Sequence, residues 1–185
     1  MSSFVVVLDA CVLIPAPLRD TLLRAAEADL YRAQWSEDIL NEVERNLISD
    51  LGRTAEQAKR LVDTMRAYFP EALVTGHESV IPAMTNDPKD RHVLAAAVVS
   101  GAQLIVTSNL RDFRDEALAP FGIEAQAPDD FLVSLFDLDP DSMLQLIIRQ
   151  AHDLQNPPKT VEELLSILER HAPVFAAHIR EKIKQ

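Results

Sequence analysis

The chain has 185 residues, of which 48% are hydrophobic, and its 29 acidic and 18 basic side chains give a formal net charge of −11. This apolar content excludes an intrinsically disordered chain, and we expect neither a membrane helix nor a signal peptide, because no apolar run approaches roughly 20 residues and the start lacks a basic leader. The single cysteine, Cys11, allows no internal disulfide and fits a cytoplasmic protein, while the acidic balance argues against tight non-specific binding to nucleic acid.

The first half of the chain predicts one buried strand followed by helices. Residues 4–8, FVVVL, are apolar without polar alternation, which is typical of a parallel strand buried on both faces. Ser36 and Thr54 have the side chains that cap helix starts, and Gly52 is a natural helix stop. The predicted elements after the first strand are helices at 18–30, 36–51 and 54–68 and a short strand within 71–76.

The region 86–107 predicts a helix that leads into a second buried strand. Asp87 is the expected N-cap, Pro88 the first helical residue, and Gly101 the stop. The apolar run QLIVT at 103–107 then predicts the strand, and this helix–strand alternation indicates an α/β fold with a parallel sheet. A short helix at 115–122 and a final strand at 123–127 complete the pattern.

From residue 129 the pattern is entirely helical. Thr160 and Glu163 form a capping box at the start of one of these helices. We therefore expect an α/β body over residues 1–136 and a C-terminal helical extension over residues 137–185. The predicted helices of this part are 129–138, 139–154, 161–171 and 173–185.

Three acids occupy positions where chemistry is expected. Asp9 ends the first strand, Asp112 follows the strand at 103–107, and Asp90 lies in the first turn of the helix that precedes that strand. Ligands bind outside the carboxyl ends of parallel strands, and carboxylates that converge there need a hard cation between them, such as Mg²⁺ or Mn²⁺. Asp90 and Asp112 also have structural explanations. Asp90 would interact favourably with the helix dipole, Asp112 would be a turn residue or an N-cap, and Asp87 would cap the helix without a further function. Asp9 has no comparable structural explanation.

Four stretches in this order resemble the PIN domain: VVVLDACVLIP, DILNEVERNL, TNDPKDRHVLAAAV and LIVTSNLRDF. The chain is most similar to VapC-type toxins with a C-terminal helical extension. The resemblance implies a three-layer α/β/α fold around a small parallel sheet, and an endoribonuclease that depends on Mg²⁺ or Mn²⁺ and cleaves RNA with metal-activated water. It also implies a cognate VapB-type antitoxin, and we expect a homodimer.

The resemblance also implies an acidic constellation of Asp9, Glu42, Asp90 and Asp112, with the three aspartates as metal ligands. Two features depart from a simple match. Asn109 stands where many members of the family have an aspartate, and a helical wheel of 36–51 places Glu44 nearer the apolar face than Glu42. The family pattern, an acid followed five residues later by leucine, selects Glu42.

Supporting roles are expected for neighbouring side chains. Thr107 is a candidate to hold Asp9 or a water, and Asn109 to orient a water or a carboxylate. Because a metal-activated water needs no histidine base, His92 is interpreted as a helix-surface residue. The candidates for contacts with RNA phosphates are Arg91, Arg111 and Arg114, for which solvated surface positions are the alternative.

Two other functions compete with the endoribonuclease. A PIN-like module without activity, kept for binding a partner, is supported by Asn109 and the acidic composition. A phosphotransfer protein on a similar sheet is disfavoured, because LDACV lacks a second aspartate and no lysine follows Thr107 closely. Binding of Mn²⁺ separates the nuclease from the inactive module.

Overall fold

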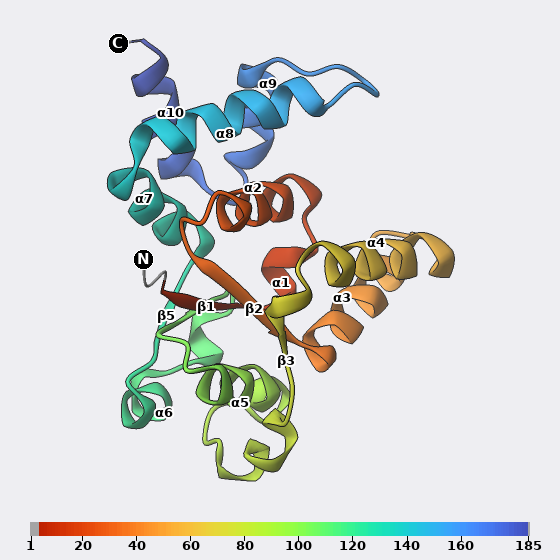
Figure 1. Cartoon of the computed structure of the whole chain (residues 1–185), viewed down its shortest axis with the longest axis vertical. Helices are drawn as coiled ribbons and strands as arrows, with labels where there is room; N and C mark the ends of the chain where they lie inside the picture. Colours follow the sequence, from red (N-terminus) through yellow and green to blue (C-terminus); the bar gives the residue numbers. More distant parts are fainter. Residues whose placement is uncertain (1–3, 185) are drawn as a thin grey trace. The chain divides into compact units, whose positions relative to one another are not determined.

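Five parallel strands form one sheet in the order β3-β2-β1-β4-β5. The structure is a computed structural model that describes residues 4–184 (Figure 1). The strands predicted from the sequence are present. The strand β2 was not predicted, because it contains Arg and Gln and does not read as a buried segment, although the sheet buries it almost completely. The strands are β1 (Val5–Leu8), β2 (Arg32–Ser36), β3 (Leu73–Val74), β4 (Leu104–Val106) and β5 (Glu124–Gln126).

Helices flank this sheet, which confirms the predicted α/β fold class. Helix α5 contacts β1, β2 and β4, whereas α3 contacts β2 and pairs with α4 (Figure 1). Ser36 and Thr54 cap α3 and α4 as predicted, and Gly101 ends α5 with a left-handed φ of 67°. The helices are α1 (Ala10–Leu13), α3 (Glu37–Ser49), α4 (Ala55–Tyr68), α5 (Arg91–Ser100) and α6 (Asp115–Leu118).

The chain groups into two compact units. The sheet unit comprises the residues up to Ile14 together with Arg32–Gln126, and the helical unit comprises Pro15–Tyr31 together with the residues from Ala127 onward. The division expected at residue 136 places both α2 and the first turns of α7 in the body, whereas their contacts group them with the C-terminal helices. The helices of the helical unit are α2 (Ala16–Glu27), α7 (Pro128–Leu138), α8 (Pro140–Asp153), α9 (Val161–Leu168) and α10 (Pro173–Ile183).

Buried polar bonds tie α2 to α8 within the helical unit. The Thr21 hydroxyl donates to Gln150 Oε1 (2.8 Å), and Gln150 Nε2 donates to the Pro17 carbonyl (3.0 Å). Both Thr21 and Gln150 are at most 1% exposed, so these bonds satisfy groups that burial would otherwise penalise. The predicted capping box of Thr160 and Glu163 is present at the start of α9. Among the described residues, no helix combines the length and apolar character that a membrane crossing requires.

The sheet order positions the chemistry. Connections from β1 run through β2 to β3 on one side, and the chain then returns to β4 and β5 on the other. The change of direction lies between β1 and β4, and ligands bind outside the carboxyl ends of strands at such a point. In the register, Leu8 pairs with Val106, so the next residues, Asp9 and Thr107, are neighbours.

Candidate active site

Asp9 is held in one orientation at the end of β1. Its Oδ2 accepts the Thr107 hydroxyl (2.7 Å) and the Cys11 thiol (3.2 Å), and its Oδ1 accepts the Ala10 backbone N–H (2.7 Å). The Asn109 backbone N–H in turn donates to Thr107 Oγ1 (3.0 Å). Asp9 is 3% exposed, and this burial raises its pKa despite the three donors. The hydrogen bond predicted between Thr107 and Asp9 is therefore present, and Asn109 contributes through its backbone.

Cys11 lies in a polar environment beside Asp9 and Thr107. Its sulfur also accepts the Ser108 backbone N–H (3.2 Å) and lies 3.4 Å from Thr107 Oγ1. Burial and the neighbouring Asp9 carboxylate raise the pKa of the thiol to about 12. Cys11 is therefore a protonated donor to Asp9, because a nucleophile would have to be a thiolate.

Asp90 and Asp112 face each other across Lys89. Asp90 is 6% exposed at the end of a 3-10 turn, Pro88–Asp90, and precedes α5 without capping it through its side chain. Asp112 ends the 3-10 turn Leu110–Asp112 after β4. The Lys89 ammonium lies 3.0 Å from Asp112 Oδ2 and 3.9 Å from Asp90 Oδ2. Both oxygens are buried and neither receives a hydrogen bond of good geometry, so the ammonium is an ion-pair partner only.

Glu42 reaches the site from the flank of α3. Its Oε2 lies 3.6 Å from His92 Nε2, and the imidazole is the main cause of a lowered Glu42 pKa. Burial lowers the His92 pKa, but the carboxylate outweighs it, so the pKa of His92 is raised overall. The side chain of His92 is only 16% exposed, which corrects its interpretation as a surface residue. Glu42 also acts on Asp9 and Asp90 electrostatically, a placement that agrees with the family pattern.

The four acids form one electrostatic cluster. The pKa of Asp90 is raised to about 6, first by burial and then by Asp9, with smaller contributions from Asp112 and Glu42 that Lys89 partly offsets. The same Lys89 ammonium lowers the pKa of Asp112. Like charges raise a carboxyl pKa in this way only when they are near each other. The structure therefore places Asp9, Glu42, Asp90 and Asp112 near enough to act on one another electrostatically, and their roles as metal ligands and catalytic residues stay predictions.

The donor set of this acid cluster suits a hard divalent cation. Buried oxygens of Asp90 and Asp112 without hydrogen-bond partners are the ligands that Mg²⁺ and Mn²⁺ prefer. Within residues 4–184, however, no group of three or more Asp, Glu, His or Cys side chains has the arrangement needed to hold a metal ion. The free oxygens of Asp90 and Asp112 lie beside the Lys89 ammonium, whose side chain is 58% exposed, so oxygen donors for a cation are present at this place.

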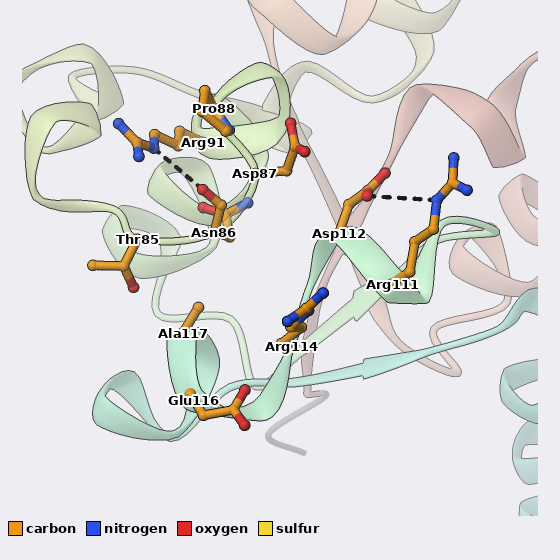
Figure 2. Close-up of a pocket in the computed structure, with 10 residues that line it drawn as sticks. All are labelled: Thr85, Asn86, Asp87, Pro88, Arg91, Arg111, Asp112, Arg114, Glu116 and Ala117. Atoms are coloured by element: carbon orange, nitrogen blue, oxygen red, sulfur yellow. Dashed lines mark hydrogen bonds and ion pairs between the residues drawn. The ribbon is translucent and has the colours of Figure 1, made fainter.

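A polar cavity of about 580 Å³ adjoins the acid cluster at Asp112 (Figure 2). The three predicted RNA-contacting arginines all line it. Sequence reasoning missed the cavity and Lys89, although the three charged side chains of DPKD were a visible signal for an ion pair. The lining residues are Thr85, Asn86, Asp87, Pro88, Arg91, Arg111, Asp112, Arg114, Glu116 and Ala117.

Comparison with known proteins gives two family matches. The PIN domain family matches residues 5–111, and a family described as VapC50 C-terminal domain matches residues 128–181. The first match includes Asp9, Glu42 and Asp90 and ends one residue before Asp112. The second begins at the first residue of α7.

A curated relative supports the same assignment. The protein named "Putative ribonuclease VapC50", from Mycobacterium tuberculosis (strain ATCC 25618 / H37Rv), is 44% identical over 121 residues, which cover 63% of this chain and 72% of that protein. No solved structure gives a significant match. The match over residues 5–111, the parallel sheet and the acids at its carboxyl edge agree with one another, and the chain belongs to the PIN domain family.

Proposed function

We propose that this protein is an endoribonuclease of the VapC type, which hydrolyses RNA phosphodiesters with the help of Mg²⁺ or Mn²⁺. The observation that carries the proposal is the cluster of Asp9, Glu42, Asp90 and Asp112 at the change of direction of the sheet, where burial and mutual repulsion raise the pKa of Asp90 to about 6. The similarity to a protein named as a ribonuclease supports the reaction class.

The residues of the acid cluster have different proposed roles. Asp9, Asp90 and Asp112 would hold the cation, and Asp9 is already oriented by Thr107, Cys11 and Ala10. When bound, a divalent cation neutralises phosphate charge and makes water a better nucleophile.

Glu42 remains to orient the attacking water by accepting a hydrogen bond at its carboxylate. His92, 3.6 Å from Glu42 Oε2, keeps that carboxylate charged, because its imidazole lowers the Glu42 pKa. A water held by an ionised carboxylate is directed at the phosphorus without an additional histidine base.

The direct test is a cleavage assay on total RNA with the wild-type protein and Asp9→Asn. We expect cleavage by the wild type with Mg²⁺ or Mn²⁺, no cleavage after chelation by EDTA, and no cleavage by the variant. Asp9→Asn keeps a side chain of the same shape, and circular dichroism verifies that it is folded. Undiminished cleavage in EDTA would refute the metal-dependent mechanism.

An inactive binding module is the second candidate, because the Lys89 ammonium pairs with Asp112 where a cation would bind. Calorimetric titration with Mn²⁺ separates the two, since an inactive site that keeps its lysine would take up no ion. A cognate VapB-type antitoxin, a homodimer and a cytoplasmic location belong to the proposal through the family resemblance. Size-exclusion chromatography with light scattering tests the dimer.

A further inference from the structure

The cavity beside the acid cluster has the size and position of a ligand site. Its volume of about 580 Å³ lies within the roughly 300–1,000 Å³ that is usual for small-molecule pockets. Asp112 belongs both to its wall and to the acid cluster, so a ligand in the cavity lies next to the proposed reaction centre. All of its lining residues come from the sheet unit, from the segment 85–91 that ends with the first residue of α5 and from the segment 111–117 after β4.

Two arginines of the cavity are free to bind an anion. Arg91 donates from Nε to the Asn86 backbone carbonyl (3.3 Å), and among the described residues neither Arg91 nor Arg114 forms an ion pair. In a chain of net charge −11, arginines elsewhere, such as Arg66 and Arg180, pair with carboxylates. Two unpaired guanidinium groups at one cavity therefore suit phosphate recognition.

The rest of the wall suits a base more than a further phosphate. Asp87, Asp112 and Glu116 contribute carboxylates, which repel an anion but accept hydrogen bonds from exocyclic amino groups. Asn86 is 6% exposed, and neither its Nδ2 nor its Oδ1 has a hydrogen-bond partner. A ligand that offers both a donor and an acceptor would satisfy this buried amide.

We propose that this cavity binds the nucleotide next to the scissile phosphodiester, with Arg91 and Arg114 on separate phosphates of the bound strand and the Asn86 amide at the base edge. The inference rests on the proposed function, because it takes the acid cluster as the place of cleavage. Figure 2 shows Arg114 on the η5–α6 side of the cavity (η5, Leu110–Asp112), opposite the segment that carries Asn86 and Asp87. RNA fits this wall better than an acidic peptide, which has an anionic group but no base edge. Single-stranded RNA presents such unpaired edges to proteins.

The test measures RNA binding apart from catalysis. In the Asp9→Asn background, fluorescence anisotropy follows a fluorescein-labelled, 20-nucleotide single-stranded RNA of mixed sequence. We expect Arg91→Gln and Arg114→Gln each to weaken binding about threefold to tenfold and to reduce the slope of log K against log salt by about 0.7, as the loss of one phosphate contact does. The matched control is Arg149→Gln, at a separate cavity of about 330 Å³ in the helical unit, which should leave binding unchanged.

Metal binding and folding provide the remaining readouts. Mn²⁺ affinity, measured with Asp9 intact, should be the same in the wild type, Arg91→Gln and Arg114→Gln. Arg114 is exposed, so its variant remains informative if Arg91→Gln does not fold. RNA binding within twofold of the parent in Arg114→Gln, with an unchanged salt slope, would overturn the inference.

The two proposals can fail separately. If the wild type cleaves RNA with Mn²⁺ while both arginine variants bind RNA normally, the cavity assignment fails and the nuclease stands. If the wild type never cleaves RNA but the arginine variants lose binding, the nuclease fails and the cavity is an RNA-binding site of a different protein function.

Discussion

Replacing Asp90 by Asn should stabilise the metal-free protein at neutral pH. Asp90 is 6% exposed, its Oδ2 has no hydrogen-bond partner, and it makes no capping bond that the substitution could remove. An uncharged amide of the same shape removes the repulsion from Asp9, Asp112 and Glu42. The loss of the Lys89 ion pair at 3.9 Å is a small cost, because that lysine is 58% exposed.

The size of the effect follows from the pKa of Asp90. A rise from 3.8 to about 6 is about two units, and one unit corresponds to about 1.4 kcal/mol. Because the folded state binds the proton more tightly than the unfolded state, the free energy of unfolding falls as the pH rises from about 4 to about 6. At pH 7.5 the full penalty applies, so Asp90→Asn should gain about 1–3 kcal/mol, where 3 is a ceiling, and below pH 4 the gain should vanish.

Urea denaturation followed by circular dichroism, in EDTA at pH 7.5 and again below pH 4, measures this gain. Asp87→Asn is the matched control, because Asp87 lies three residues away and its Oδ1 accepts the Lys89 backbone N–H (3.1 Å), a bond that Asn can also make. Asp87→Asn should have the same free energy of unfolding as the wild type. Added Mn²⁺ should raise the stability of the wild type and leave Asp90→Asn nearly unchanged. The electrostatic reasoning would be refuted if Asp90→Asn were less stable than the wild type at pH 7.5. It would also be refuted if the gain in the free energy of unfolding were the same at both pH values.

Three further changes test the site and the helical unit. Glu42→Gln should reduce RNA cleavage strongly and Glu44→Gln only weakly, because Glu42 is the glutamate that acts on Asp9. Initial rates of RNA cleavage measure both effects, and the reverse order would contradict the assignment. Thr107→Val should weaken Mn²⁺ binding in calorimetry while Thr107→Ser preserves it, since of these side chains only a hydroxyl can donate to Asp9 Oδ2. Equal Mn²⁺ affinities of the two variants would show that this hydrogen bond is dispensable. A chain that ends at Leu138 lacks α8, the partner of α2, and should lose thermal stability while keeping Mn²⁺ binding; loss of the ion by a folded truncation would place part of the site in the extension.

Much of the site was predictable because its acids lie next to strong local signals. Asp9 directly follows an uninterrupted apolar run, and Asp90 follows an Asp-Pro pair that predicts a helix start, so these local patterns were enough to locate both residues beside their elements. Parallel strands end at a common edge, which brings such residues together. Glu42 is different: a helical wheel reports which face of α3 is apolar, and Glu42 acts from the flank of that face.

Other features depend on contacts between residues far apart in the sequence. The strand β2 contains Arg32 and Gln34, and only pairing with β1 and β3 turns this polar-looking segment into a buried strand. His92 has no local reason to be buried, and its role follows from the position of Glu42 on another helix.

Local sequence patterns therefore determined the strand that leads into Asp9, the capped helices and the family. The grouping of α2 with the C-terminal helices, the Lys89 ion pair and the arginine-lined cavity required the tertiary structure. The physical reason is range: capping and periodicity act within a few residues, whereas the bond between Thr21 and Gln150 joins positions 129 residues apart. Hydrogen bonds and ion pairs of that kind are set by packing, which the order of residues along the chain does not display.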